Sequence, residues 1–144
     1  MTKDINVQAQ QRLGEIIEAR AFDRFGEVWA EDVIDHDPAP DQAPGIEGIV
    51  AFWKQFTSAF PDLALEPQIL TADDDSVSAV FRITGTHTGD FQGHGPTGNT
   101  FEVRGIQVAK FRDGKIAERW GSTDEKGLAE QLKLTGGEAH FVTA

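Results

Sequence analysis

Apolar residues recur every three or four positions in three stretches of the first 60 residues, and this spacing is typical of amphipathic helices. In the first stretch, Leu13, Ile16 and Ile17 form one apolar stripe. The second stretch covers about residues 22–30, and the third covers residues 45–60. The pattern therefore predicts three helices in this part of the chain.

From residue 63 onwards, apolar and polar residues alternate, which is typical of strands with one buried face. The predicted strands occupy about residues 63–71, 77–87, 99–112 and 115–120, and a short helix follows them. Residues 32–44 begin with a few strand-like positions and continue as a proline-rich loop. Helices followed by strands indicate an α+β fold. We expect a curved antiparallel sheet that wraps around the N-terminal helices and forms a cone-shaped barrel with an internal pocket.

The chain has 144 residues without a repeat, a low-complexity tract or a long linker, so we expect a single domain over residues 1–144. A domain of this size buries roughly two thirds of its unfolded surface, which is enough for a core without covalent cross-links. The chain contains no cysteine, which excludes disulfides and thiolate catalysis. It also contains no tyrosine, which excludes any mechanism that needs a phenol.

The formal net charge of -11 opposes binding to nucleic acids and to anionic membrane surfaces. The first residues are polar, and no apolar run approaches the roughly 20 residues of a membrane-spanning helix. We therefore expect no nucleic-acid partner, no membrane association and a cytoplasmic location.

The dipeptide Asp113-Gly114 between two alternating runs predicts a tight hairpin, because both turn positions need a positive φ. A two-residue turn sets the register of the two strands. Gly105, where the apolar face of the long strand changes, is a candidate β-bulge. The predicted pairs are Arg112–Lys115, Phe111–Ile116, Ala109–Glu118, Gln107–Trp120 and Val103–Asp124.

This register places Gln107, Glu118 and Asp124 on the same face as several apolar side chains. An acid on an apolar face is costly unless it is paired or has a function. For Asp124 two interpretations stay open. It is either a pocket carboxyl with a raised pKa, or an ordinary acid in the first helical turn of a capping box, with Ser122 as the N-cap and Glu125 reaching back.

Glu118 and Trp120 have similar alternatives. An inward Trp120 is either core or pocket wall. An inward Glu118 is either a second acid or the partner of an arginine, for which the candidates are Arg82, Arg104 and Arg119.

Two histidines are candidate site residues. His36 lies between Asp35 and Asp37 and is either a solvated loop residue or part of a site. His87 ends the apolar face of its strand, so it either has a backbone partner or lies on the wall of the cone. His87 and His94 lack the spacing of metal ligands, and we expect no metal site.

Several short motifs together resemble the SnoaL-like polyketide cyclase, or ester cyclase, family over about residues 18–134. Each motif is short, but their order and spacing are characteristic of the family. They are Val33-Ile-Asp-His36, Gly45-Ile-Glu-Gly48, Phe60-Pro-Asp62, Gly85-Thr-His-Thr-Gly-Asp-Phe91, Pro96-Thr-Gly98, Asp113-Gly-Lys-Ile116, Glu118-Arg-Trp120, Asp124, Gly127-Leu128 and Gln131-Leu132.

The resemblance implies a cone-shaped α+β barrel that forms dimers or tetramers through its sheet. It also implies ring closure of a polyketide ester by intramolecular aldol condensation, without a metal or cofactor. By position, Asp124 would be the buried acid and base, with His36 and His87 on the pocket wall. The substrate-binding side chains would be Trp120, Phe52 and Phe56, and by their inward register also Gln107, Glu118 and Phe101.

Two other functions stay open. The inward aromatic residues suit a non-catalytic protein that holds a small apolar molecule equally well. An isomerase or epoxide hydrolase on the same fold is disfavoured, because those sites rely on a tyrosine beside a carboxylate. A homodimer or homotetramer is expected, since Ile106 and Val108 point outward from the long strand.

Overall fold

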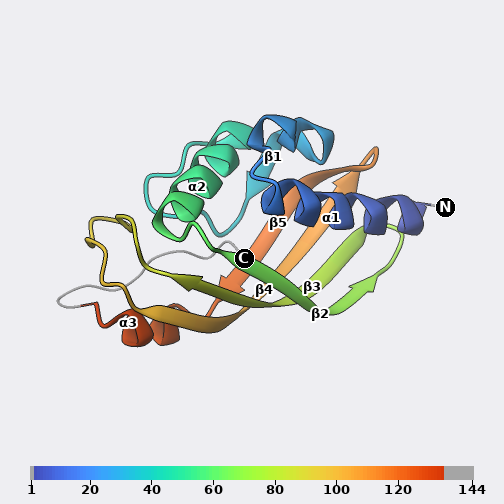
Figure 1. The fold of residues 1–144 in the computed structure, drawn as a ribbon. Coiled ribbons are helices and arrows are strands. Elements are labelled where there is room, and N and C mark those ends of the chain that lie inside the picture. The colour runs from blue at the N-terminus through green and yellow to red at the C-terminus, as the bar shows by residue number, and fades with distance from the viewer. Residues whose placement is uncertain (1, 135–144) are drawn as a thin grey trace.

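A curved five-stranded sheet wraps around the N-terminal helices, as the computed structural model of residues 2–134 shows (Figure 1). The predicted α+β fold is confirmed. The elements in chain order are α1 (Thr2–Glu18), the 3₁₀ helix η1 (Phe22–Glu27), β1 (Trp29–Asp35), α2 (Gly45–Ala59), β2 (Ala64–Ala72), β3 (Ser76–Thr86), β4 (Thr100–Arg112), β5 (Lys115–Thr123) and α3 (Glu125–Leu132).

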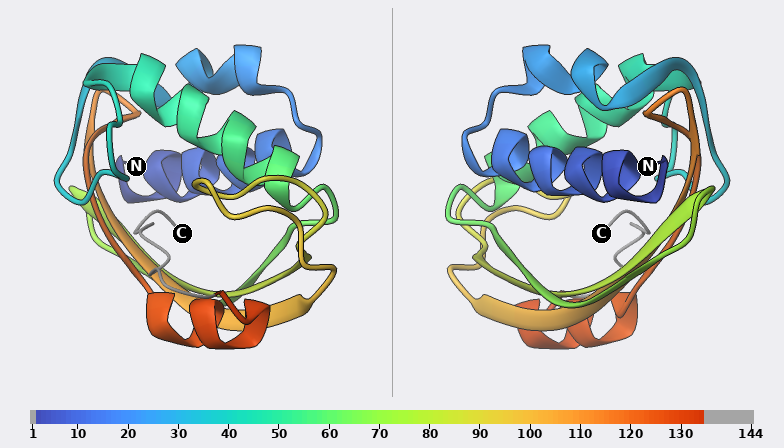
Figure 2. Two further views of the ribbon diagram at one scale, coloured as in Figure 1. Left: turned by 90° about the vertical axis from the view of Figure 1, so that its left-hand side faces the viewer. Right: turned by 90° about the vertical axis from the view of Figure 1, so that its right-hand side faces the viewer.

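The strand order in the sheet is β1-β5-β4-β3-β2. Four strands pair antiparallel as predicted, but β1 pairs parallel with β5, so the sheet is mixed. The sheet curls without closing, and its free edges are β1 and β2. Helices α1 and α2 lie in its concave side (Figure 2). Helix α3 lies beside β4, where the Gln131 side chain bonds the backbone of Glu102 and Leu128 and Leu132 join the core.

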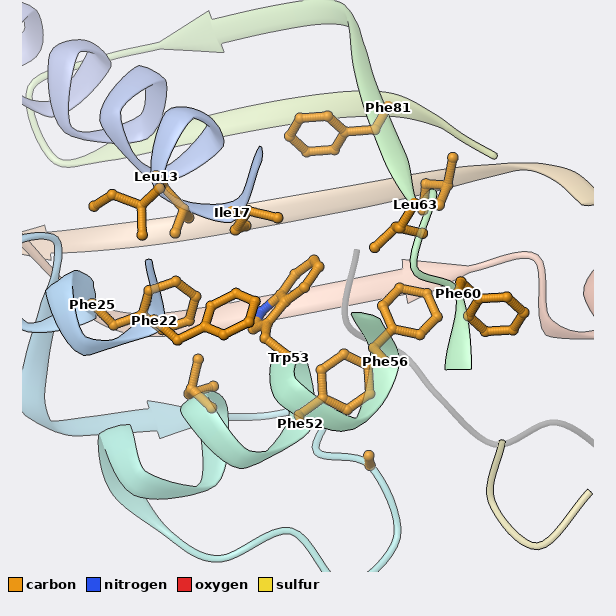
Figure 3. Close-up of a cluster of buried hydrophobic side chains, with 14 of the residues drawn as sticks. Leu13, Ile17, Phe22, Phe25, Phe52, Trp53, Phe56, Phe60, Leu63 and Phe81 are labelled. Atoms are coloured by element: carbon orange, nitrogen blue, oxygen red, sulfur yellow. The ribbon is translucent and has the colours of Figure 1, made fainter. Parts of the chain in front are cut away.

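The core lies between the concave face and the two helices (Figure 3). On α1 the predicted stripe of Leu13, Ile16 and Ile17 is buried. On α2 the rings of Phe52 and Phe56 lie 5.3 Å apart. Because every ring of this cluster is buried on the same side of the sheet, the aromatic residues of α2 hold the helix layer in place.

The second predicted helix is shorter than expected. The 3₁₀ helix η1 ends at Glu27, and β1 begins at Trp29. Val28, Trp29 and Ala30 are all buried, and their spacing is therefore compatible with a helix. In the structure Val28 is the C-cap of η1, whereas Trp29 and Ala30 begin the strand that pairs with β5.

The hairpin between β4 and β5 has the predicted turn but not the predicted register. Asp113 and Gly114 have φ angles of 51° and 79°, as a type I′ turn requires. The first two pairs, Arg112–Lys115 and Phe111–Ile116, are those predicted. Beyond them Ala117 is an extra residue on β5. As a result, Lys110 pairs with Glu118, Ala109 with Arg119 and Gln107 with Gly121.

The predicted bulge at Gly105 is absent, since β4 pairs continuously with β3 there.

An extra residue reverses which side chains of a strand point to each face. After Ala117, Arg119 and Thr123 are therefore buried on the concave side. Glu118 and Trp120 lie on the convex side instead, opposite the expectation.

Candidate functional site

Asp124 does not line the interior. It is exposed and serves as the N-cap of α3, where its Oδ1 accepts a hydrogen bond from the Gly127 backbone N–H at 2.9 Å. The expected pairing with Val103 and the expected buried carboxyl are both wrong, because the extra residue in β5 shifts the register. The capping interpretation is closer to the structure, although Asp124 rather than Ser122 is the cap.

His36, Glu118 and Trp120 form a cluster on the convex side and do not line the interior. The His36 and Trp120 rings stack at 4.4 Å with 7° between their planes. His36 Nε2 lies 3.0 Å from Glu118 Oε1, and each of these two side chains is 36% exposed. Trp120 pairs with Val108, whose neighbours Gln107 and Ala109 point inward, so the cluster lies outside the cone.

His87 is buried on the concave side, and of the two open alternatives the structure shows the backbone partner. Its Nδ1 faces Thr97, whose backbone N–H donates to it at 3.3 Å. The hydroxyl oxygen of Thr97 also lies 3.1 Å from Nδ1. Nε2 is buried without a hydrogen-bond partner among the described residues. The catalytic role of His87 stays a prediction.

Phe52, Phe56 and Phe101 are buried, and each contacts other aromatic rings. Phe52 and Phe56 pack on one another and on Trp53. The ring of Phe101 meets that of Phe60 at 4.9 Å. All three therefore have a role in the core, and their part in binding a substrate stays a prediction.

A cavity of about 260 Å³ lies between α1 and the concave face of the sheet. It is bounded on opposite sides by the two layers of the fold, and most of its wall is apolar. It opens to solvent beside Gly14 and Glu18 of α1, which are exposed. Pockets with a few polar groups among apolar ones are typical ligand sites. The apolar wall is formed mainly by Leu13, Gly14 and Ile17 of α1, Leu65, Pro67 and Leu70 of β2, and Phe81 of β3.

The polar part of this wall includes Gln11, Glu15 and Glu18 of α1, which are exposed, and two buried glutamines. Gln107 of β4 is 3% exposed, and its Oε1 accepts a hydrogen bond from Arg119 Nε at 3.2 Å. Gln10 of α1 is also buried, and its Oε1 has no hydrogen-bond partner among the described residues. The predicted inward orientation of Gln107 is confirmed. The pair suits an apolar molecule with a hydrogen-bonding group.

Behind Gln107 lies an ion pair that was not predicted as part of the site. Arg119 Nη1 donates to Asp35 Oδ1 at 2.7 Å, and the two side chains are 0% and 7% exposed. Burial lowers the pKa of the Arg119 guanidinium, and the charges of Asp35 and Asp37 oppose this shift. In the sequence, Arg119 appears only as one of three possible partners for Glu118. The sequence feature that could have indicated this ion pair is an arginine within a strand whose other inward side chains are apolar.

The described residues, 2–134, contain no group of three or more histidine, aspartate or glutamate side chains that could hold a metal ion. In the same part of the chain, no helix combines the length and the apolar character needed to cross a membrane.

Comparisons with known proteins connect this geometry to a family. TsrD from Streptomyces laurentii has a TM-score of 0.82 at 24% identity, over 90% of this chain and 95% of its own, which shows a shared fold. IdmH from Streptomyces antibioticus, a proposed polyketide cyclase, has a TM-score of 0.77 at 27% identity, over 90% of this chain and 99% of its own. A proposed SnoaL-like polyketide cyclase from Jannaschia sp. CCS1 has a TM-score of 0.80 at 26% identity, over 90% of this chain and 92% of its own.

No curated protein matches the chain. The family model described as SnoaL-like polyketide cyclase matches residues 7–132. Because this match covers most of the chain and the solved structures share its fold, the protein belongs to the SnoaL-like polyketide cyclase family.

Proposed function

We propose that this protein binds a small, largely apolar molecule of the polyketide type in the cavity between α1 and the sheet, and closes its ring by intramolecular aldol condensation without a cofactor. The observation that carries the proposal is the apolar cavity with the buried amide of Gln107 in its wall. Family membership supports the reaction type.

In such a ring closure, a base removes the proton from a carbon between two carbonyls. The resulting enolate carbon attacks a second carbonyl of the same molecule, a carbon–carbon bond forms, and the new alkoxide takes up a proton. A buried donor such as the Gln107 amide would stabilise the enolate oxygen. The apolar wall would hold the molecule in the folded pose that ring closure needs.

Asp124 lies outside the cavity, so it is not the base in this proposal. Two carboxylates, those of Glu15 and Glu18, belong to the wall that α1 contributes. They are the candidates for the proton acceptor, since each is beside the space that the substrate would occupy.

Ring closure of an uncyclised aromatic polyketide methyl ester, followed by liquid chromatography and mass spectrometry, tests the proposal. We expect Gln107→Leu to lower kcat by about 10²-fold, a typical effect of losing one oxyanion donor. The double variant Glu15→Gln/Glu18→Gln should lose turnover but keep binding. Asp4→Asn, on the same helix but not in the cavity wall, is the matched control. Unchanged turnover in a folded Gln107→Leu protein would contradict the proposal.

A second candidate is a non-catalytic protein that holds a small apolar molecule. The specific observation in its favour is that Asp124 and His36, both expected in the pocket, lie outside it. On this account, the polyketide ester would bind with a measurable Kd and be recovered unchanged after prolonged incubation. Production of the cyclised compound at a rate above the buffer reaction would reject it.

A further inference from the structure

Arg119 is a charged side chain that the proposed reaction does not use directly. It is completely buried on the concave side, and its Nε and Nη1 donate to Gln107 and Asp35, respectively. A guanidinium carries only donors and has no acceptor. The group that faces Arg119 Nε must therefore be an acceptor.

This constraint sets the orientation of the Gln107 amide. The two ends of an amide look alike in shape, but one is an acceptor and the other carries two donors. Because Oε1 faces the guanidinium at 3.2 Å, the Nε2 end is the one left for other contacts. No hydrogen bond from this Nε2 to another described residue is observed. Gln107 thus contributes N–H donors to the cavity wall.

The guanidinium is itself held from the edge of the sheet. Asp35 is the direct neighbour of Arg119 in the parallel pairing of β1 with β5. Asp35 Oδ1 also accepts the Asp37 backbone N–H at 3.0 Å, and Asp35 Oδ2 accepts Gln42 Nε2 at 3.0 Å. With the carboxylate fixed by three donors, the fork of Arg119 has one orientation.

We propose that Arg119 is a positioning residue that orients the Gln107 amide and so makes the cavity select ligands with an acceptor oxygen, a ketone or ester carbonyl or the enolate derived from it. The inference rests on the proposed function in one respect, that this cavity is the ligand site. A hydrogen bond from a charged donor polarises the acceptor amide, which strengthens its own N–H donors. The chain therefore favours a carbonyl over an equally shaped group without an acceptor.

Two compounds of nearly the same shape test this selectivity. 1-Tetralone carries a carbonyl oxygen, and 1-methylenetetralin has a methylene carbon in its place. We expect wild-type protein to bind 1-tetralone about three- to tenfold more tightly in calorimetry, the range that one net hydrogen bond supports. The infrared C=O stretch of bound 1-tetralone should also shift to lower wavenumber than in an apolar solvent.

Two variants separate positioning from simple structural support. Gln107→Glu keeps an acceptor for Arg119 but removes the N–H donors, so the preference for the ketone and the infrared shift should both disappear. The double variant Asp35→Asn/Arg119→Gln avoids an unpaired buried charge. The glutamine introduced in place of Arg119 can donate or accept, so the Gln107 amide can turn, and the ketone preference should fall toward unity while 1-methylenetetralin still binds.

Each outcome has a defined meaning. If the double variant binds the hydrocarbon and keeps the full ketone preference and infrared shift, Arg119 does not orient the amide. If wild-type protein binds both compounds equally, the donor is not available and the inference is wrong, although the cavity stands as a binding site. If neither compound binds wild-type protein, the proposed ligand site fails, and this inference fails with it.

Discussion

Asp124 illustrates how a single side chain decides between a structural and a catalytic role. Its carboxylate satisfies the Gly127 N–H at the start of α3, and a capping side chain of this kind contributes about 1 kcal/mol. We expect Asp124→Ala to lower the free energy of unfolding by about that amount in urea titrations. Asp124→Asn, which can still cap, should lose much less. Affinity for 1-tetralone should be the same in both variants, and a large change in affinity with unchanged stability would restore a pocket role.

The ion pair of Arg119 and Asp35 is the other feature at this scale that stability measurements can probe. Removing one partner of a buried pair leaves an uncompensated charge and typically costs about 3–5 kcal/mol. We expect this loss for Arg119→Met, measured by urea unfolding. The neutral pair Asp35→Asn/Arg119→Gln should lose clearly less, because no charge is left buried. Equal losses in the two proteins would show that packing rather than charge dominates at this position.

At the scale of elements, one hydrogen-bonded carboxylate joins the end of α2 to the sheet. Asp62, in the turn before β2, accepts from the backbone N–H of Thr86 at 2.8 Å and from its Oγ1 at 2.7 Å. The hydroxyl bond from Thr86 and, less strongly, its backbone N–H lower the pKa of Asp62, and burial opposes this shift only in part. A depressed pKa in the folded state means that the contribution to stability is present above the unfolded-state pKa, about 3.9. It is lost as the pH falls through the lower, folded-state pKa.

We therefore expect the free energy of unfolding to decrease as the pH is lowered below about 5, and to decrease more steeply for wild-type protein than for Asp62→Asn. Thermal unfolding at a series of pH values measures this difference. Asp41→Asn is the control, since Asp41 is exposed in the β1–α2 loop. Parallel pH profiles for wild type and Asp62→Asn would contradict the expectation.

The glycine in the middle of α1 is the second feature at this scale. Gly14 belongs to the cavity wall, and a Cβ added to it would meet no atom within 4 Å. A glycine inside a helix costs about 0.5–1 kcal/mol relative to alanine, and no close packing at this position requires it. We expect Gly14→Ala to raise the free energy of unfolding by about this amount.

Gly14→Leu should place a larger side chain over the cavity and weaken 1-tetralone binding by about tenfold, or 1.4 kcal/mol. Arg12→Leu, which adds an apolar side chain on an α1 position outside the cavity wall, should leave binding unchanged. Calorimetry on the three proteins measures the effect. Full affinity in Gly14→Leu would place the ligand elsewhere.

The elements themselves were largely predictable because each depends on a local signal. The stripe on α1, the alternation in β3 and the turn at Asp113-Gly114 all fix structure within a few residues of themselves. The extra residue Ala117 has no such signal, since alanine fits a regular strand as well as a bulge. Its position is favoured by a contact 84 residues away in sequence, the burial of Arg119 against Asp35. After the extra residue, each side chain of β5 points to the face opposite the predicted one. Asp124 and Trp120 therefore lie outside the interior. Gln107 belongs to β4, which has no extra residue, and it points inward as predicted.

At the scale of the whole molecule, the convex face of the sheet has an apolar strip that no helix covers among the described residues. Ile69, Val80 and Ile106 are direct neighbours across β2, β3 and β4. Ile69 and Ile106 are 57% and 42% exposed. Contiguous exposed apolar side chains of this kind are typical of protein–protein contacts. The strip is on the face of the sheet opposite the cavity, so a partner bound here would leave the ligand site open.

We expect this strip to be the contact between two copies of the chain. The net charge of -11 on each copy opposes association, so higher salt concentration, which screens that repulsion, should strengthen the dimer. Light scattering coupled to size-exclusion chromatography at micromolar concentration should give twice the 15.7 kDa mass of one chain. Ile106→Lys would place a buried charge in the contact and should give a monomer. Ile5→Lys changes an isoleucine of α1 that is 53% exposed and should remain dimeric. A wild-type monomer at both low and high salt would show that the strip is not a contact between copies.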